Sequence, residues 1–146
     1  MKVFPLIIAG LAGGSMALQG VLNSILGKKI GEFEATFIVH AIATGLLGIV
    51  LVLGVTNGSL RNIRSVPWFG FLGGPLSVII IWGVLASIGK VGAGSATTAI
   101  VAVQILTALV LDLTGLAGDK VPLCATKVVG AVIFIIGAYL LLKQPA

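Results

Sequence analysis

Five long apolar runs, each close to the length that a helix needs to cross a bilayer, constrain this chain most strongly. A hydrocarbon core about 30 Å thick takes roughly 20 residues of α-helix at about 1.5 Å per residue. The runs predict helices over 3–26, 35–55, 67–88, 96–116 and 125–142. The connections between them are too short to hold a further domain. We therefore expect an all-α integral membrane protein with five transmembrane helices, in which residues 1–146 form a single domain.

The scarcity of charge supports the same class. Only 9% of the residues are Asp, Glu, Lys or Arg, too few to cover the surface of a water-soluble domain. The net charge of +5 would indicate nucleic acid in a soluble protein. Here, however, Lys and Arg fall between the apolar runs, where they meet lipid head groups. We expect a bilayer partner and no nucleic-acid partner. The first run is too long for the apolar part of a signal peptide, so it is expected to be retained.

The first run carries the most informative side chains. Three glycines occupy its first half: Gly10, Gly13 and Gly14. Ser15, Gln19 and Asn23 follow at spacings of four, which stacks these polar groups on one helical face. Small residues let another backbone approach closely, and uncharged polar groups in hydrocarbon need partners. This face is therefore predicted to point into a helix bundle or a wet cavity.

Asp112 is the one carboxylate inside an apolar run, about a turn from the end of the fourth. As a functional group it would bind a cation or carry a proton. As a structural group it would pair with Lys127, Arg61 or Arg64, or cap backbone amides of a neighbouring loop. Its shallow depth favours the structural interpretation. His40 is the other group that could change charge near neutral pH, although a lone histidine among apolar residues is more often hydrogen-bonded in a packed interface.

Gln104 lies near the middle of the fourth run, with Thr107 on the same face. A glutamine at this depth is costly without a partner, and Gln19 is a natural one. The two amides would either lock two helices together or line a solute pathway. Trp82 lies deep in the third run. Its ring either serves packing, or it faces a cavity where it accepts a cation or an apolar solute. The candidate substrate-binding residues are Ser15, Gln19, Asn23, Gln104, Thr107 and Trp82.

The sequence offers no constellation of residues for an enzyme. It contains no acidic pair suited to acid–base catalysis, no His/Cys cluster and no phosphate-cradling loop that ends in Gly-Lys-Ser/Thr. Cys124 is the single cysteine, so there is no disulfide or paired metal ligand. We expect no enzymatic activity, no metal site and no cofactor.

The basic residues predict an unusual topology. An odd number of spans puts the termini on opposite sides, so the basic residues fall into two sets. One side holds Lys2, Arg61, Arg64, Lys120 and Lys127, and the other holds Lys28, Lys29, Lys90 and Lys143. Because the sets are nearly equal, the positive-inside rule selects neither orientation. Such a chain can insert in both orientations and pair antiparallel, as in a ten-helix inverted-repeat transporter. The alternative is a single orientation fixed by the first helix.

Several further residues bear on packing. Gly70 with Gly74, and Gly130 with Gly137, favour close approach of helices. Pro75 predicts a kink or local unwinding in the third run.

The order of these residues resembles a known family. The motifs are Gln19-Gly20, Asn23, Leu26-Gly27, Gly31, Gly73-Gly74, Gln104, Asp112, Gly115 and Gly118. Together with the five-span layout they resemble the YdcZ-type (DUF606) branch of the drug/metabolite transporter superfamily over nearly the whole chain. The resemblance implies bacterial inner-membrane proteins that occur as dual-topology homodimers, as oppositely oriented pairs or as fused ten-span chains. Val103, Pro75 and Ser77 depart from the family pattern, which bears on packing around any pocket.

The related small multidrug resistance proteins depend on a glutamate in their first helix. Gln19 and Asn23 cannot release a proton, so Asp112 or His40 must carry protons if protons drive transport. Otherwise the protein is a facilitator or uses another ion. We predict a secondary transporter or facilitator of a small metabolite or drug-like solute, working by alternating access of an antiparallel dimer. Two other classes stay open, namely a small dual-topology ion channel and a non-transporting membrane subunit.

Overall fold

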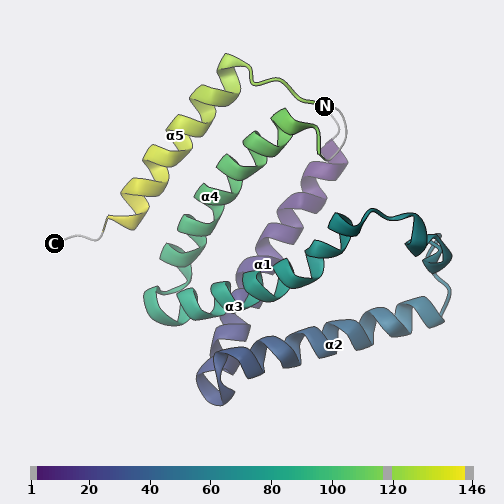
Figure 1. The fold of residues 1–146 in the computed structure, drawn as a ribbon. Coiled ribbons are helices and arrows are strands. Elements are labelled where there is room, and N and C mark those ends of the chain that lie inside the picture. Colours follow the sequence, from purple (N-terminus) through teal and green to yellow (C-terminus); the bar gives the residue numbers. More distant parts are fainter. Residues whose placement is uncertain (1–2, 117–119, 144–146) are drawn as a thin grey trace. The chain divides into compact units, whose positions relative to one another are not determined.

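The computed structural model describes residues 3–116 and 120–143, so Lys2 and Gly118 lie outside the described residues. Five helices are long and apolar enough to cross a membrane (Figure 1). They are α1 (Val3–Ile30), α2 (Glu32–Val52), α3 (Gly73–Val91), α4 (Ala93–Thr114) and α5 (Ala125–Leu142), with two 3₁₀ turns before α3, Leu60–Ser65 and Trp68–Leu72. The predicted all-helical, five-span character is confirmed.

The chain divides into two compact units, Met1–Lys90 and Val91–Ala146. The first contains α1, α2, the 3₁₀ turns and nearly all of α3, and the second contains α4 and α5. Each unit is described by itself. The prediction that residues 1–146 form one domain stays a prediction.

Two predicted connections are much shorter in the structure. The helix predicted to end at residue 26 continues to Ile30, and α2 begins at Glu32, so Gly31 alone joins them. Gly31 has φ 106° and ψ 150°, a conformation open essentially to glycine. Gly92, with φ 81°, likewise stands alone between α3 and α4. The predicted boundaries were wrong because charged Lys and Glu side chains are compatible with helix and can extend toward the membrane surface.

The start of the third span is unwound. Residues Trp68–Leu72 form a 3₁₀ turn and the α-helix begins only at Gly73. Pro75 therefore lies in the first turn of α3, where its missing N–H leaves no hydrogen bond unmade. The predicted local unwinding is present, and it lies before Pro75.

The core of the first unit forms where the second half of α1, the start of α2 and the second half of α3 meet. Ala35 and Leu85 are almost fully buried there. A Cβ on Gly20 would lie 2.6 Å from Ile88 Cδ1, and one on Gly27 would lie 2.9 Å from Leu85 Cδ1. These two glycines therefore allow α1 to approach α3 more closely than any larger residue would.

The first half of α1 has no such neighbours. Residues 3–19 are all exposed within the first unit. A Cβ added at any of its three glycines would meet no atom within 4 Å, and these are Gly10, Gly13 and Gly14. Gly130 and Gly137 of α5 are equally open. None of these glycines serves close packing inside its own unit.

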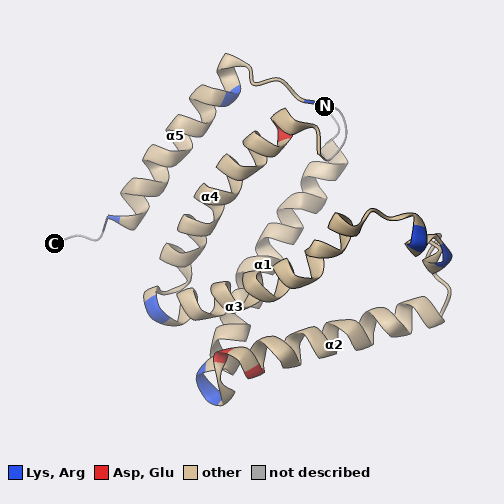
Figure 2. Cartoon of the chain, viewed as in Figure 1, with Lys and Arg blue, Asp and Glu red and all other residues tan. Residues whose placement is uncertain are grey.

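The second unit is a hairpin in which α4 and α5 lie side by side (Figure 1). The left-handed Gly115, with φ 71°, ends α4. The Val121 N–H then donates to the Asp112 carbonyl at 3.0 Å, which returns the chain to the end of α4. Charged residues lie at the helix ends and in the connections, and the long middle parts of the helices carry none (Figure 2).

Candidate functional site

The polar stripe of α1 divides between two environments. Ser15 and Gln19 are exposed, whereas Asn23, one turn further on, is 8% exposed and faces the core of the first unit. Within the described residues, the side-chain hydrogen bonds do not include any of these three groups. The stripe therefore brings unpaired amides both to the outer surface of α1 and to the inner packing region.

The predicted partners on the fourth span are also exposed. Gln104 and Thr107 lie on the outer surface of α4, and the Thr107 hydroxyl donates to the Val103 carbonyl at 2.9 Å. Gln19 belongs to the first unit and Gln104 to the second. A pair between the two amides stays a prediction.

Asp112 lies opposite Lys127 across the α4–α5 hairpin. The Lys127 Nζ is 3.4 Å from Asp112 Oδ2, and the side chains are 36% and 44% exposed, respectively. Of the basic residues proposed as partners of Asp112, Lys127 is therefore the one that contacts it within the second unit. A pocket of about 330 Å³ adjoins the pair and is lined by Leu109 and Phe134 among others. The contact favours the structural interpretation of Asp112.

His40 links α2 to α3. Its Nδ1 is 2.8 Å from the Thr36 carbonyl oxygen, and its Nε2 is 3.0 Å from Ser77 Oγ. The Ser77 hydroxyl also lies 2.7 Å from the Gly74 carbonyl, to which it donates. In the sequence, Ser77 stands out only as a departure from the family pattern, and its contact with His40 is identified by the pairing of the two helices.

The protons of this series of hydrogen bonds can be counted. A carbonyl only accepts, so Nδ1 carries a proton, and in the neutral ring Nε2 is then an acceptor. The single hydroxyl proton of Ser77 therefore faces two acceptors, Nε2 and the Gly74 carbonyl. If His40 is charged, Nε2–H donates to Ser77 and Ser77 donates to Gly74, so all contacts are satisfied. In either case the Ser77 hydroxyl joins the His40 ring of α2 to α3.

The Trp82 ring stacks on another aromatic ring, and its indole N–H donates a hydrogen bond. It stacks on Phe33 with ring centroids 5.5 Å apart and an interplanar angle of 12°. Its Nε1–H donates to Glu32 Oε2 at 3.1 Å. Sequence reasoning missed Glu32, because 50 residues separate it from Trp82. The acidic first turn of α2 was the one available signal.

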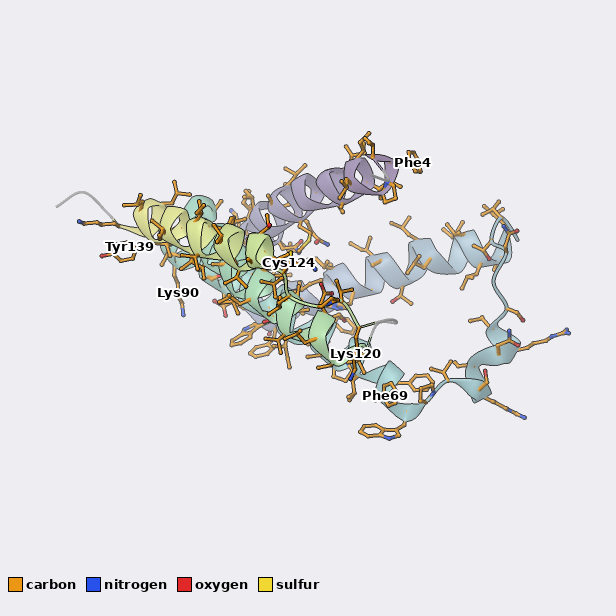
Figure 3. The ribbon with its side chains drawn as sticks, turned by 90° about the horizontal axis from the view of Figure 1, so that it is seen from above. Phe4, Phe69, Lys90, Lys120, Cys124 and Tyr139 are labelled. Carbon is orange, nitrogen blue, oxygen red and sulfur yellow. The ribbon has the colours of Figure 1, made fainter. Side chains whose placement is uncertain are left out.

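Cys124 lies outside the spanning segments, directly before α5, and is exposed (Figure 3). The Lys127 backbone amide is the main cause that lowers the pKa of the Cys124 thiol below its ordinary value. More of the thiol is therefore ionised near neutral pH. Apolar side chains such as Phe4 and Tyr139 project from α1 and α5 in the same view, as expected for surfaces in contact with lipid or another helix (Figure 3).

Five apolar helices whose charges cluster at their ends define a multi-pass membrane protein. A family model described as "Putative inner membrane exporter, YdcZ" matches residues 4–140, so the chain belongs to this family. The inner membrane protein YdcZ of Escherichia coli (strain K12) is 26% identical over 130 residues, which cover 85% of this chain and 87% of that protein. No solved structure matches the chain.

These comparisons confirm the predicted family and the location in the inner membrane. They support a transporter-type role, since the family is described as an exporter and not as an enzyme.

Proposed function

We propose that this chain is a secondary transporter that exports a small neutral or zwitterionic solute, working as an antiparallel dimer with alternating access. The family description supports the transporter class. The solute class, the dimer and the mechanism rest chiefly on the residues of α1.

The observation that carries the proposal is the unpartnered first half of α1. Gln19 is exposed on a helix that crosses hydrocarbon, and the glycines of the same half have open space around them. An amide in hydrocarbon without a partner is costly, and small residues are typical of close helix contacts. A second copy that faces this surface would enclose both the glycines and the amide.

The chemistry of the enclosed groups indicates the solute. Ser15, Gln19 and Gln104 offer donors and acceptors without net charge. A cavity lined by such groups from two inverted copies would suit a neutral or zwitterionic solute better than an ion. The rocking of the two copies against each other would open this cavity on alternate sides.

His40 is the proposed proton-carrying group. Asp112 forms an ion pair with Lys127, whereas the hydrogen bonds of His40 change with the charge of its ring. Neither ring contact is to a charged side chain. A proton on His40 would turn Nε2 from an acceptor into a donor toward Ser77, which couples protonation to the contact between α2 and α3. We expect His40→Gln to remove the pH dependence of transport, and Asp112→Asn to retain it.

The transport test uses proteoliposomes loaded with a defined mixture of amino acids and polyols, with release followed by mass spectrometry. The protein should release a subset of the mixture, and Gln19→Leu should stop that release. Gln19→Asn is the matched control, because it keeps the amide and should retain part of the activity. Equal release by Gln19→Leu and the unmodified protein would remove the cavity assignment. Ohmic currents in a planar bilayer would assign the chain to the channel class.

Cys124 allows a direct test of orientation. It is the sole cysteine of the sequence, it is exposed, and its lowered pKa favours reaction with maleimides. A membrane-impermeant maleimide applied to spheroplasts should label about half of the protein if copies insert both ways. Labelling of all or none would contradict dual insertion. Residue 59 is expected on the same side of the membrane as Cys124. Ser59→Cys in a Cys124→Ser background should therefore be labelled to the same fraction.

A further inference from the structure

A small pocket with polar and apolar lining lies at the end of the first unit where α1 turns into α2. It has a volume of about 130 Å³, and its polar lining comes from Ser24, Lys28, Glu32 and Lys90. Gly27 and Gly89 also line it. All of these residues belong to the first unit, and none is among the candidate transport residues.

Ser24 is the buried polar group of the pocket. The residue is 4% exposed, yet its hydroxyl makes no hydrogen bond with the rest of residues 3–116 and 120–143. A Cβ on Gly89 would lie 3.3 Å from Ser24 Oγ and 3.7 Å from Lys28 Cε. The glycine therefore keeps the hydroxyl and the lysine stem accessible from the pocket. Among the described residues, no fully buried side-chain nitrogen or oxygen lacks a hydrogen-bond partner, so the Ser24 hydroxyl is open to the pocket and free to bind a ligand there.

Glu32 adds a carboxylate, the opposite charge, to the same pocket. Its Oε2 accepts the Trp82 indole N–H at 3.1 Å, and Trp82 is held by its stack on Phe33. Neither Lys28 nor Lys90 forms an ion pair with Glu32, since the ion pair found among the described residues joins Lys127 and Asp112. The pocket therefore keeps cationic and anionic groups apart instead of neutralising them internally.

These groups together complement one ligand chemistry. Two ammonium groups and a hydroxyl suit a phosphate, and a carboxylate beside an aromatic stack suits an ammonium group. We propose that this pocket binds a phosphodiester that carries a primary ammonium group, as in a phosphoethanolamine head group. The phosphate contacts Lys28, Lys90 and Ser24, and the ammonium contacts the free Oε1 of Glu32.

The position of the pocket fits a lipid as the source. The last turn of α1 carries Lys28 and Lys29 next to the acidic start of α2 (Figure 2). Lys90 lies in the last turn of α3. Charged residues that bound apolar spans lie at head-group depth, and basic pockets between helices at that depth bind lipid head groups.

The size of the pocket excludes a bulkier ligand. Pockets for drug-sized solutes have volumes of about 300–1,000 Å³, whereas one water takes about 30 Å³ of liquid. At about 130 Å³ the pocket has room for a phosphate group and not for a drug-sized molecule. Acyl chains would lie outside it, along the exposed apolar surfaces of α1 and α3.

The test counts retained lipids on the full chain in a mild detergent by native mass spectrometry. The probes are lipids with identical acyl chains and phosphoethanolamine, phosphocholine or phosphoglycerol head groups. The phosphoethanolamine lipid should be retained on the order of tenfold more than the phosphoglycerol lipid, the effect of one hydrogen bond between charged groups. Phosphocholine should also be retained less, because its quaternary ammonium cannot donate to Glu32.

Matched variants identify the groups. Lys90→Gln should lower retention of all three lipids, and Lys29→Gln, whose lysine does not line the pocket, should not. Glu32→Gln should remove the preference for phosphoethanolamine over phosphoglycerol, and Glu34→Gln should keep it. Ser24→Ala, a small change that preserves packing, should lower retention several-fold even if another variant folds poorly. Helical content of each variant is checked by circular dichroism.

Soluble glycerophosphoethanolamine distinguishes the two sources of the ligand. If it displaces the lipid at comparable concentration, the pocket recognises a free phosphate ester, and if it does not, the lipid is the ligand. Either result supports the proposed chemistry. The proposal is overturned if Lys90→Gln behaves like Lys29→Gln, or if Glu32→Gln keeps the full preference for phosphoethanolamine.

Discussion

The two halves of α1 differ although both are rich in small residues. Residues 3–19 are exposed throughout, and the glycines there have open space around them. The second half holds every buried residue of the helix, namely Gly20, Asn23, Ser24 and Gly27. Glycine therefore has two uses in one helix: in the second half it allows contact with α3, and in the first half it leaves a surface for something outside the first unit.

The two halves of α1 therefore gain their packing energy from different contacts. The second half of α1 gains its contacts from the fold of the first unit itself. The first half can gain equivalent contacts only from outside the first unit, that is, from lipid, from the second unit or from another protein. Substitutions in the two halves should consequently act on different quantities, the stability of the unit in one case and the assembly in the other.

The largest effect is expected for Gly27→Leu. The added side chain would collide with Leu85, which is 2% exposed and cannot move aside freely. Overpacking of this kind lowers the free energy of unfolding by about 1–3 kcal/mol. Thermal unfolding in detergent, followed by circular dichroism, measures the loss, with Gly27→Ala as a milder reference. An unchanged melting temperature would contradict the close contact between α1 and α3.

A comparable or somewhat smaller loss is expected for Gly31→Ala. The φ of 106° is strained for any residue with a Cβ, and the new Cβ would also meet the Glu34 carboxylate. Such backbone strain costs about 1–3 kcal/mol. The same unfolding measurement applies. Gly58→Ala is the control, because a Cβ at Gly58 meets open space.

Trp82→Phe should cost less. The phenyl ring keeps an aromatic partner for Phe33, but the hydrogen bond to Glu32 is lost. The loss of one such bond costs about 1 kcal/mol. Trp68→Phe is the comparison, since Trp68 is 75% exposed and its ring meets that of Phe69 edge-on. Equal melting temperatures for the two variants would show that the bond to Glu32 adds no stability.

The smallest effect on unfolding is expected for Gly13→Leu, in the open half of α1. Nothing lies within 4 Å of the new Cβ, so the change should stay within about 0.5 kcal/mol. Its effect should fall on assembly, measured as the fraction of dimer by chemical cross-linking in membranes. A dimer fraction equal to that of the unmodified protein would show that this face lies in lipid.

Length and hydropathy sufficed to predict the five helices, because a spanning helix must be apolar over a fixed distance. The same pattern missed the turns at Gly31 and Gly92. A single residue with positive φ can end one helix and let the next begin, and the surrounding charged residues do not stop a helix. On both sides of Gly31 and Gly92 the predicted helices were therefore too short.

The candidate site was less accessible to sequence reasoning. The Lys127–Asp112 pair was among the predicted alternatives, because the two residues lie near the ends of consecutive helices. The contacts of Trp82 with Glu32 and of His40 with Ser77 join residues 50 and 37 positions apart. Helical periodicity identifies which face a residue occupies and not which residue of another helix it meets.

The single-residue junction at Gly31 would act as a pivot if α2 rotated against α1. Helix α2 has 21 residues, which is about 32 Å of helix beyond that pivot. A rotation of only about 10° there would carry its far end sideways by roughly 5 Å, while side chains beside the pivot would hardly shift. Angular change at one backbone position is thus converted into large displacement at the opposite membrane surface.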